Sequence, residues 1–173
     1  MAGDQRLIAI RPEQPGDTAV VSAVHTEAFG RPAEARIVER LRQAAGFYLG
    51  LVATDGDQIV GHILFTPVTL RSDRSSDFVL ALAPMAVRPA WQRRGIGGAL
   101  VRAGLEACRK ARHDVVLVVG HPAFYPRFGF VPARPLGLSA EPALPDAAFM
   151  VAELTPGALR GRRGVVVYGS DFS

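Results

Sequence analysis

The fold is decided by one stretch, Met85-Ala86-Val87-Arg88-Pro89-Ala90-Trp91-Gln92-Arg93-Arg94-Gly95-Ile96-Gly97-Gly98. A β-rich run ends at its start, a short basic turn follows, and glycines stand where a helical pattern begins. The first N–H groups of a helix have no partner inside the helix, and glycines let a ligand approach the backbone closely. The stretch therefore predicts an anion-binding turn, with Arg93 and Arg94 adding positive charge. The alternative is that Gly95 and Gly97 only permit tight packing of a helix on a sheet.

The patterns around this stretch predict a mixed α/β fold. Apolar runs predict strands at residues 6–11, 47–54, 59–70, 78–87, 114–119, 149–154 and 164–168. Apolar residues at helical spacing predict helices at 15–29, 33–45 and 92–112, and residues 121–125 indicate a short helix-like turn. An antiparallel meander thus leads into a strand-helix-strand crossover. Pro84 interrupts the strand over 78–87, and because proline cannot donate a ladder hydrogen bond, we expect a bulge there or a parting of two strands.

Length and composition indicate one cytoplasmic domain over residues 1–173. Of the 173 residues, 49% are hydrophobic, which is enough for the core of one ordinary domain. The one cysteine, Cys108, cannot form an intramolecular disulfide and is expected in the core, which favours a reducing compartment. The sequence has no apolar run that predicts a signal peptide or a membrane span. The net charge of +4 suits a polyanionic partner.

Two motifs resemble those of a known family. Gln92-Arg93-Arg94-Gly95-Ile96-Gly97 is similar to the Q/R-x-x-G-x-G/A pyrophosphate loop of the GNAT superfamily of N-acetyltransferases. Phe124-Tyr125-Pro126-Arg127-Phe128-Gly129-Phe130 resembles the later Tyr-x-x-x-Gly-Phe motif of that family. The resemblance spans Arg6 to Tyr168, and residues 82–133 are similar to a bacterial branch of predicted acetyltransferases with mostly unassigned substrates. It implies a mixed, mainly antiparallel central sheet flanked by helices, which parts at the strand before the pyrophosphate loop.

The resemblance also implies a binding site for acetyl-CoA as co-substrate, and no metal. It assigns backbone contacts with pantetheine and thioester to Met85, Ala86 and Val87. It assigns contacts with the pyrophosphate to Arg93, Arg94, Gly95, Ile96, Gly97 and Gly98. Tyr125 matches the position of the family's general acid, which would protonate the departing thiolate. The alternative is a tyrosine that only packs on the cofactor.

The general base is less clearly marked. Many GNAT enzymes carry a glutamate on the strand before the pyrophosphate loop, but residues 79–83 (VLALA) contain no carboxylate. We therefore consider His62 as the base, or Glu27 and Glu34 through an ordered water. A histidine between Val60 and Leu64 can equally be a packed, hydrogen-bonded structural residue. His121 could bond the cofactor or the tyrosine, or be only a turn residue before proline.

The leading hypothesis is an N-acetyltransferase in which an amine attacks the thioester of acetyl-CoA directly. The acceptor could be a small amine, an amino acid, an antibiotic, or a protein N-terminus or lysine, bound by the segments 29–35, 71–77 and 135–146. Two alternatives remain. The chain could be an acetyl-CoA-binding sensor or interaction module with little catalysis, which the missing carboxylate would suit. A nucleic-acid-binding protein ranks third because the sequence lacks any recognised motif for nucleic-acid recognition.

The resemblance to the family also allows a homodimer, and we expect no membrane partner.

Overall fold

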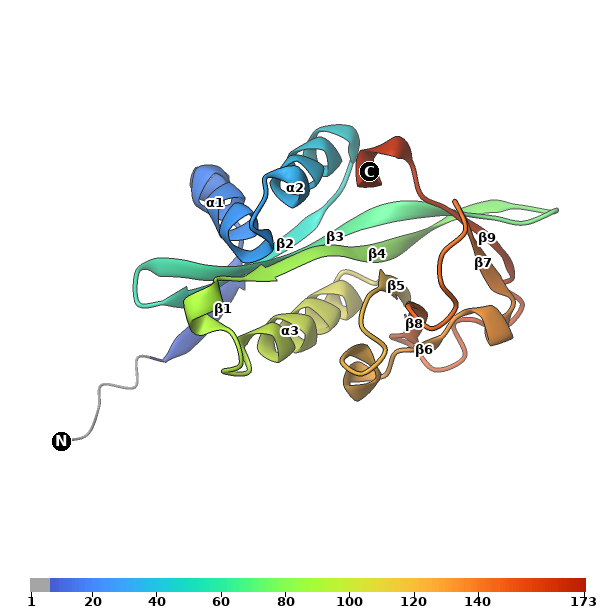
Figure 1. The fold of residues 1–173 in the computed structure, drawn as a ribbon. Coiled ribbons are helices and arrows are strands. Elements are labelled where there is room, and N and C mark those ends of the chain that lie inside the picture. Colours follow the sequence, from blue (N-terminus) through green and yellow to red (C-terminus); the bar gives the residue numbers. More distant parts are fainter. Residues whose placement is uncertain (1–6) are drawn as a thin grey trace.

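The structure is a computed structural model that describes residues 7–173, and its strands form one nine-stranded sheet (Figure 1). The order is β1-β2-β3-β4-β5-β8-β6, while β9 pairs with both β3 and β7. All pairs are antiparallel except β4 with β5 and β7 with β9. The strands are β1 (Ile8–Pro12), β2 (Leu49–Asp55), β3 (Gln58–Arg71), β4 (Ser76–Val87), β5 (Val115–Val119), β6 (Val131–Pro132), β7 (Leu138–Glu141), β8 (Phe149–Glu153) and β9 (Gly164–Val167).

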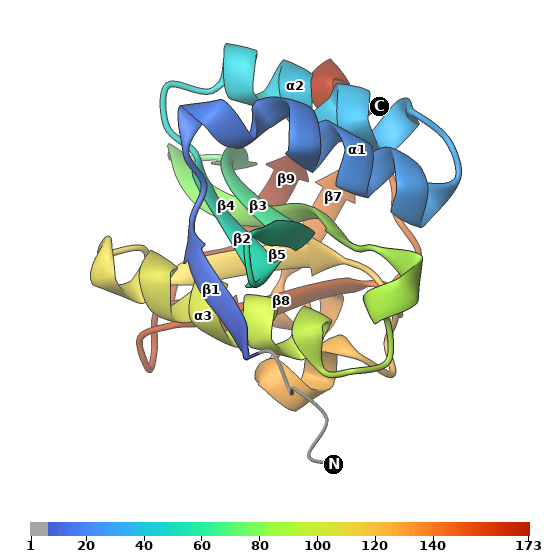
Figure 2. The same ribbon diagram turned by 90° about the vertical axis from the view of Figure 1, so that its left-hand side faces the viewer.

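Helices cover both faces of this sheet. The α-helices are α1 (Thr18–Phe29), α2 (Ala33–Ala44) and α3 (Ile96–Lys110). Short 3-10 helices lie at Pro15–Asp17, Pro89–Trp91, Tyr125–Phe128, Arg134–Leu136 and Ser170–Phe172. Helices α1 and α2 lie on one face and α3 on the other (Figures 1 and 2). The predicted mixed, mainly antiparallel sheet flanked by helices is confirmed. No helix between residues 7 and 173 is long and apolar enough to cross a lipid bilayer.

Strands β4 and β5 pair over three residues and then part. The parallel ladder joins Leu80–Leu82 to Val116–Val118 and goes no further. On its other side β4 remains paired with β3, but two residues of β4, Ala83 and Pro84, stand opposite the single residue Leu64. Such a two-for-one bulge bends a strand. The prediction that Pro84 marks a bulge or a parting of strands is confirmed.

Several element boundaries differ from the predictions. The helix predicted from residue 92 begins only at Ile96, because Arg93 and Gly95 have positive φ angles of 63° and 80°. The helix predicted over 15–29 starts with a 3-10 turn, and the turn predicted at 121–125 is a 3-10 helix at Tyr125–Phe128. Strands β6 and β7 were not predicted, since they are short and lie in a segment rich in proline. The first residue of the predicted strand 6–11 lies outside the described residues.

The largest core cluster lies between α3 and the sheet, and Gly104 makes its close packing possible. Phe65 of β3 is fully buried, as are Leu100 and Val101 of α3. A Cβ atom on Gly104 would stand 2.6 Å from Cζ of Phe65. Helix and sheet can therefore approach this closely only with glycine at residue 104.

We expect Gly104→Ala to destabilise the protein although alanine favours helices. Overpacking against Phe65 costs about 1–3 kcal/mol, and the higher helix propensity of alanine returns at most about 1 kcal/mol. Gly97→Ala, in the same helix, is the control, because a Cβ atom there meets its nearest neighbours at an ordinary 3.7 Å. Urea unfolding at equilibrium should show a loss of stability for Gly104→Ala and none for Gly97→Ala. Equal midpoints for the two variants would contradict the packing argument.

Candidate active site

A cleft of about 1140 Å³ opens where β4 and β5 part. Its walls come from the end of β4, the turn that follows, the first turn of α3, the end of β5 and the 3-10 helix Tyr125–Phe128. Most of the predicted cofactor contacts line it, namely Met85, Ala86, Val87, Arg93, Gly95, Ile96, Gly97 and Gly98. Arg94 is exposed and is not among the lining residues. The structure thus brings nearly the whole predicted binding segment to one cleft.

The end of β4 offers free backbone groups to this cleft. The N–H of Arg88 donates to Val60 of β3 (2.8 Å), and in an antiparallel ladder every second residue faces the partner strand. Ala86 therefore faces β3, and its carbonyl oxygen lies beside Gly61. Met85 and Val87 face the opposite way, into the space that β5 has left. The side-chain amide of Gln92 already donates to the carbonyl of Val87 (2.9 Å).

The turn before α3 holds unpaired N–H groups at the cleft. The first hydrogen bond inside the helix runs from the N–H of Ala99 to the carbonyl of Gly95 (3.0 Å), so residues 96–98 have N–H groups without a partner in the helix. Arg93 keeps a left-handed backbone, which costs a residue with a Cβ roughly 1–2 kcal/mol. Strain of this kind is typical of ligand-binding turns. A Cβ atom on Gly97 would project between Met85 and Phe124, two residues that line the cleft.

The charge around the cleft is positive. Arg93, Arg102 and Arg127 line it, and no aspartate or glutamate within residues 7–173 does. The guanidinium of Arg102 lies over the ring of Phe128 (5.0 Å), and that of Arg127 lies over the ring of Phe124 (5.5 Å). Stacking fixes both cations at the mouth of the cleft. Arg102 and Arg127 were missed as site residues, because neither belongs to the pyrophosphate loop; Arg127 lies inside the second motif, at one of its unspecified positions.

Tyr125 lines the same cleft and is held rigidly. Its ring packs edge-on against Phe124 and Phe130, with centroid distances of 5.0 Å and 5.6 Å. Gly120 makes room for this ring, since a Cβ atom there would overlap it. Burial raises the pKa of Tyr125 to about 12, so the phenol keeps its proton near neutral pH. The cleft therefore combines a turn with unpaired N–H groups, a free strand edge and a protonated phenol.

The chain is similar to several known proteins. Residues 46–132 match the model of the GNAT acetyltransferase domain. The chain is also 34% identical to the uncharacterized N-acetyltransferase YhbS of Escherichia coli strain K12 over 165 residues, which are 95% of this chain and 98% of that protein. The chain belongs to the GNAT family of acetyltransferases. It is 39% identical over 145 residues to a second uncharacterized N-acetyltransferase of that strain, YjhQ, with 80% of each chain covered.

Two solved structures of GNAT proteins share this fold. A GNAT family N-acetyltransferase, YhbS from Escherichia coli, in complex with CoA, has a TM-score of 0.86 at 34% identity, with 95% of this chain and 91% of that chain covered. A GNAT acetyltransferase from Brucella melitensis in complex with acetyl-CoA has a TM-score of 0.78 at 31% identity, with 98% and 100% covered. The predicted family, enzyme class and acetyl-CoA co-substrate are confirmed. Within residues 7–173 no group of three or more His, Cys, Asp or Glu could hold a metal ion.

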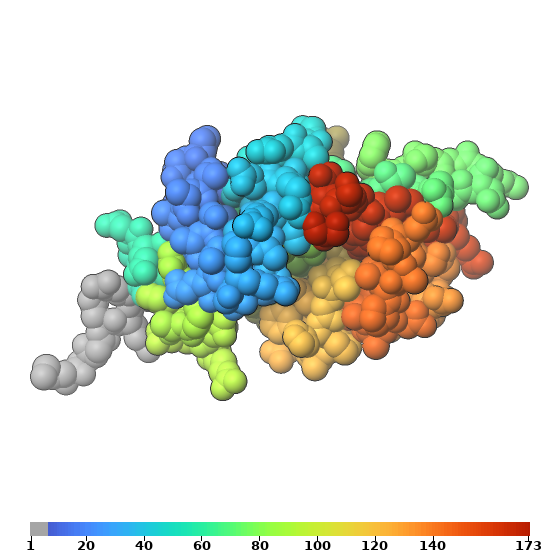
Figure 3. All heavy atoms as spheres, turned by 45° about the horizontal axis from the view of Figure 1, so that its top comes forward, coloured from blue at the N-terminus to red at the C-terminus, as the bar shows by residue number. Residues whose placement is uncertain are grey.

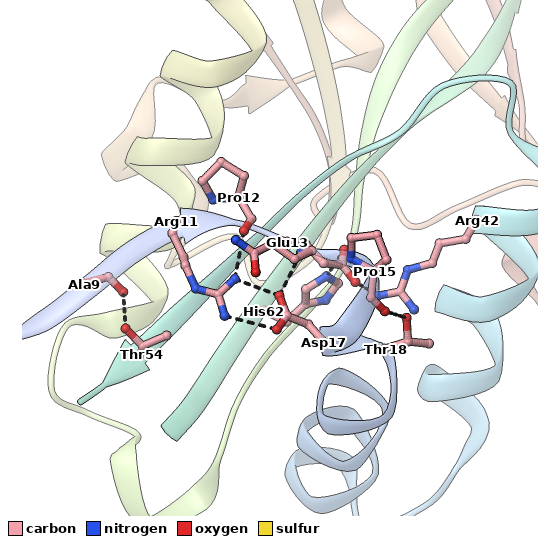
Figure 4. Close-up of polar contacts among 11 residues, drawn as sticks. Ala9, Arg11, Pro12, Glu13, Pro15, Asp17, Thr18, Arg42, Thr54 and His62 are labelled. Atoms are coloured by element: carbon pink, nitrogen blue, oxygen red, sulfur yellow. Dashed lines mark hydrogen bonds and ion pairs between the residues drawn. The ribbon is translucent and has the colours of Figure 1, made fainter. Parts of the chain in front are cut away.

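His62 of this acetyltransferase lies elsewhere. It is fully buried and is not among the residues that line the cleft. Its Nδ1 atom faces Nε2 of His25 (2.8 Å). Its Nε2 atom faces Oε2 of Glu13 (3.1 Å), and Glu13 forms an ion pair with Arg42 (Figure 4). The ring is therefore held between Glu13, which follows β1, and His25 of α1. The structure does not bring His62 together with Tyr125, and its role as general base stays a prediction that this geometry does not favour.

The two glutamates considered as bases and His121, considered as a partner of the cofactor or the tyrosine, lie in different settings. Glu27 forms an ion pair with Arg88 and Glu34 with Arg31, and neither carboxylate lines the cleft. His121, in contrast, does line it. Cys108 is buried in the core as predicted, and burial raises the pKa of its thiol to about 12, which makes it a poor nucleophile.

We expect the buried pair His25–His62 to make the protein sensitive to acid. Burial lowers the pKa of both imidazoles well below 6.5, so below about pH 6.5 the unfolded chain binds protons that the folded chain does not. Stability is therefore fully present above this pH and falls as the pH is lowered, by about 1.4 kcal/mol per pH unit for each histidine. Urea unfolding between pH 7 and 5 measures this slope.

The exposed His121 supplies the control for this prediction. His121→Gln should leave the slope unchanged, whereas the double variant His25→Gln and His62→Gln should flatten it. A slope that is the same in all three proteins would show that this buried pair does not determine the acid sensitivity.

Proposed function

We propose that this acetyltransferase moves an acetyl group from acetyl-CoA to a primary amine by direct attack of the amine on the thioester. In this reaction a C–N bond forms, the C–S bond breaks, and one proton passes from the amine nitrogen to the sulfur. The observation that carries the proposal is the meeting of the anion-binding turn and Tyr125 in one cleft. The amine acceptor is a small molecule or a peptide.

The residues of the cleft fit acetyl-CoA. The outward-facing backbone groups of Met85 and Val87 would bond the pantetheine arm as an added strand does. The unpaired N–H groups of residues 96–98 would bind the pyrophosphate, and Arg93 would offset its charge. Arg102 and Arg127, at the mouth of the cleft, would offset the negative charge of the cofactor phosphates that Arg93 does not offset. Ala86 would contact the cofactor only through its side chain, because its backbone groups face β3. Arg94 does not line the cleft and would act on the cofactor only through its long-range positive charge.

Tyr125 would transfer the proton that the reaction moves from the amine nitrogen to the sulfur. Its hydroxyl donates to the departing sulfur and takes a proton back from the acylated nitrogen, so that the enzyme ends unchanged. The rigid packing of its ring between Phe124 and Phe130 holds the hydroxyl in one direction. No covalent enzyme intermediate is needed.

Three further expectations from the sequence stay predictions. They are that the protein acts in the cytoplasm, that residues 1–173 form a single domain, and that the protein is a homodimer.

Gly97→Glu should abolish binding of acetyl-CoA. The new carboxylate would enter the space between Met85 and Phe124 and repel the phosphates beside the helix N-terminus. Gly46→Glu carries the same charge change at an exposed glycine with nothing within 4 Å of its Cβ position. Isothermal titration should show micromolar binding for the native protein and the Gly46 variant, and no binding for the Gly97 variant. Undiminished binding to Gly97→Glu would place the cofactor elsewhere.

Tyr125→Phe should lower kcat by about 100-fold or more while the Kd for acetyl-CoA stays unchanged, because only the acid is lost. Tyr48→Phe, at an exposed tyrosine outside the cleft, should leave both constants unchanged. Release of the CoA thiol measures turnover, and titration measures Kd. Acetyl-CoA binding without turnover of any amine in the native protein would favour the alternative function, a sensor. Full activity of Tyr125→Phe would remove the acid role.

A further inference from the structure

A side chain of the β2–β3 hairpin reaches the segment that leads into α3. Asp55 is the last residue of β2. Its Oδ2 atom accepts a hydrogen bond of 2.9 Å from the indole Nε1–H of Trp91. Figure 3 shows the hairpin in teal at the left, close to the lime-green segment before α3. This bond joins residues that are 36 positions apart in the chain, so only the fold brings them together.

Trp91 connects the hairpin to the cofactor cleft. Its side chain packs, partly buried, against the largest core cluster and also lines the cleft. It ends the 3-10 helix Pro89–Trp91, and the turn over residues 92–95 follows directly before α3. Asp55 is not among the residues that line the cleft. Its carboxylate therefore contacts the wall of the cleft through Trp91.

The turn over residues 92–95 has little support of its own. The N–H and the side chain of Gln92 are bonded to carbonyls that precede the turn. Within residues 7–173, however, the N–H groups of Arg93 and Arg94 donate no hydrogen bond to the protein. Arg93 nevertheless keeps its left-handed φ angle of 63°. Such a conformation persists only where the surrounding structure fixes it, so the contacts at the start of the turn matter.

Within the described residues, three hydrogen bonds tie residues 88–91 to the β2–β3 hairpin. Two of them come from Arg88, whose N–H donates to the carbonyl of Val60 (2.8 Å) and whose Nε–H donates to the carbonyl of Ile59 (3.0 Å). Both acceptors are backbone carbonyls, which every residue type provides. The third bond, from Trp91, requires the side chain of Asp55. It is also the bond that lies next to the turn.

We propose that Asp55 is a positioning residue for the cofactor: its bond to Trp91 holds the turn over residues 92–95 in the conformation that receives the pyrophosphate of acetyl-CoA. The proposal rests on the pyrophosphate site proposed above. Without the bond, the turn adopts this conformation only part of the time. The apparent Kd then rises by the inverse of the fraction that is competent to bind.

Variants of the full-length protein at the hairpin test the bond by isothermal titration of acetyl-CoA. Asp55→Ala should raise the Kd about 10-fold. Asp55→Asn, whose amide oxygen can still accept the bond from Trp91, should keep the Kd within about 2-fold of the native value. Asp57→Ala removes the same charge from an exposed residue of the same hairpin and should leave the Kd unchanged. A native Kd for Asp55→Ala, or equal losses for Asp55→Ala and Asp55→Asn, would overturn the proposal.

Fragments of the cofactor distinguish positioning of the turn from a general loss of structure. ADP contains the pyrophosphate without the pantetheine arm, and S-acetylpantetheine contains the arm and the thioester without the pyrophosphate. Competition with acetyl-CoA measures their binding. Asp55→Ala should weaken ADP about 10-fold and leave S-acetylpantetheine unchanged. Equal losses for the two fragments would show a merely structural role and overturn the proposal.

A double-mutant cycle tests whether Asp55 acts through Trp91. Trp91→Phe removes the N–H donor and keeps an aromatic ring. In the Trp91→Phe protein, Asp55→Ala should cause no further rise in the Kd for acetyl-CoA, because the bond is already lost. Effects of the two substitutions that add up in full would overturn the proposal.

Gly97→Glu separates failure of this proposal from failure of the proposed function. Loss of acetyl-CoA binding in Gly97→Glu together with a native Kd in Asp55→Ala would mean that the turn binds the cofactor and that only the positioning role fails. Native binding in both variants would remove the pyrophosphate site and the positioning role together. A raised Kd in Asp55→Ala, with unchanged binding of S-acetylpantetheine, supports the positioning role even if no amine is acetylated.

Discussion

One backbone constraint organises this molecule: two residues of β4, Ala83 and Pro84, stand opposite the single residue Leu64 of β3. The extra residue bends β4, and proline has no N–H to give to a ladder. Pairing with β5 therefore ends at Leu82, and among the described strands the later residues of β4 pair with β3 alone. The cofactor cleft and a second cavity of about 470 Å³ both open at this gap and share Leu82, Ala83 and Val119 as wall residues. A continuous β4–β5 ladder would close both.

Charge divides the two cavities as clearly as shape does. Three arginines and no carboxylate line the cleft within residues 7–173, and no charged side chain lines the second cavity there. The carboxylates nearby are already paired, Glu27 with Arg88 and Glu13 with Arg42. Among the described residues, the three arginines of the cleft have no ionic partner, so a polyanion bound there would compensate their charge.

The sequence predicted what local backbone rules control and missed what long-range contacts create. Strands, helices and the bulge at Pro84 followed from apolar periodicity and the chemistry of proline. The short strands β6 and β7 exist because β8 and β9 pair with them, and no local pattern indicates this. His62 was considered as a base because its partners, His25 and Glu13, lie 37 and 49 residues away in the chain. Only the fold brings these three side chains together.

The same distinction explains why the family could be predicted and the acceptor could not. The proposed donor site consists largely of backbone: a strand edge, a turn with positive φ angles and the N-terminus of α3. Such a site requires glycines and a proline at fixed spacing, and this spacing can be recognised as a motif in the sequence. The second cavity is walled by side chains such as Leu144, Tyr168 and Phe172, from segments with little regular structure. Apolar side chains there only define the shape of the cavity, and many different sequences can form a cavity of the same shape. The backbone-built motif therefore predicted the family, whereas no motif in the sequence predicts which amine is acetylated.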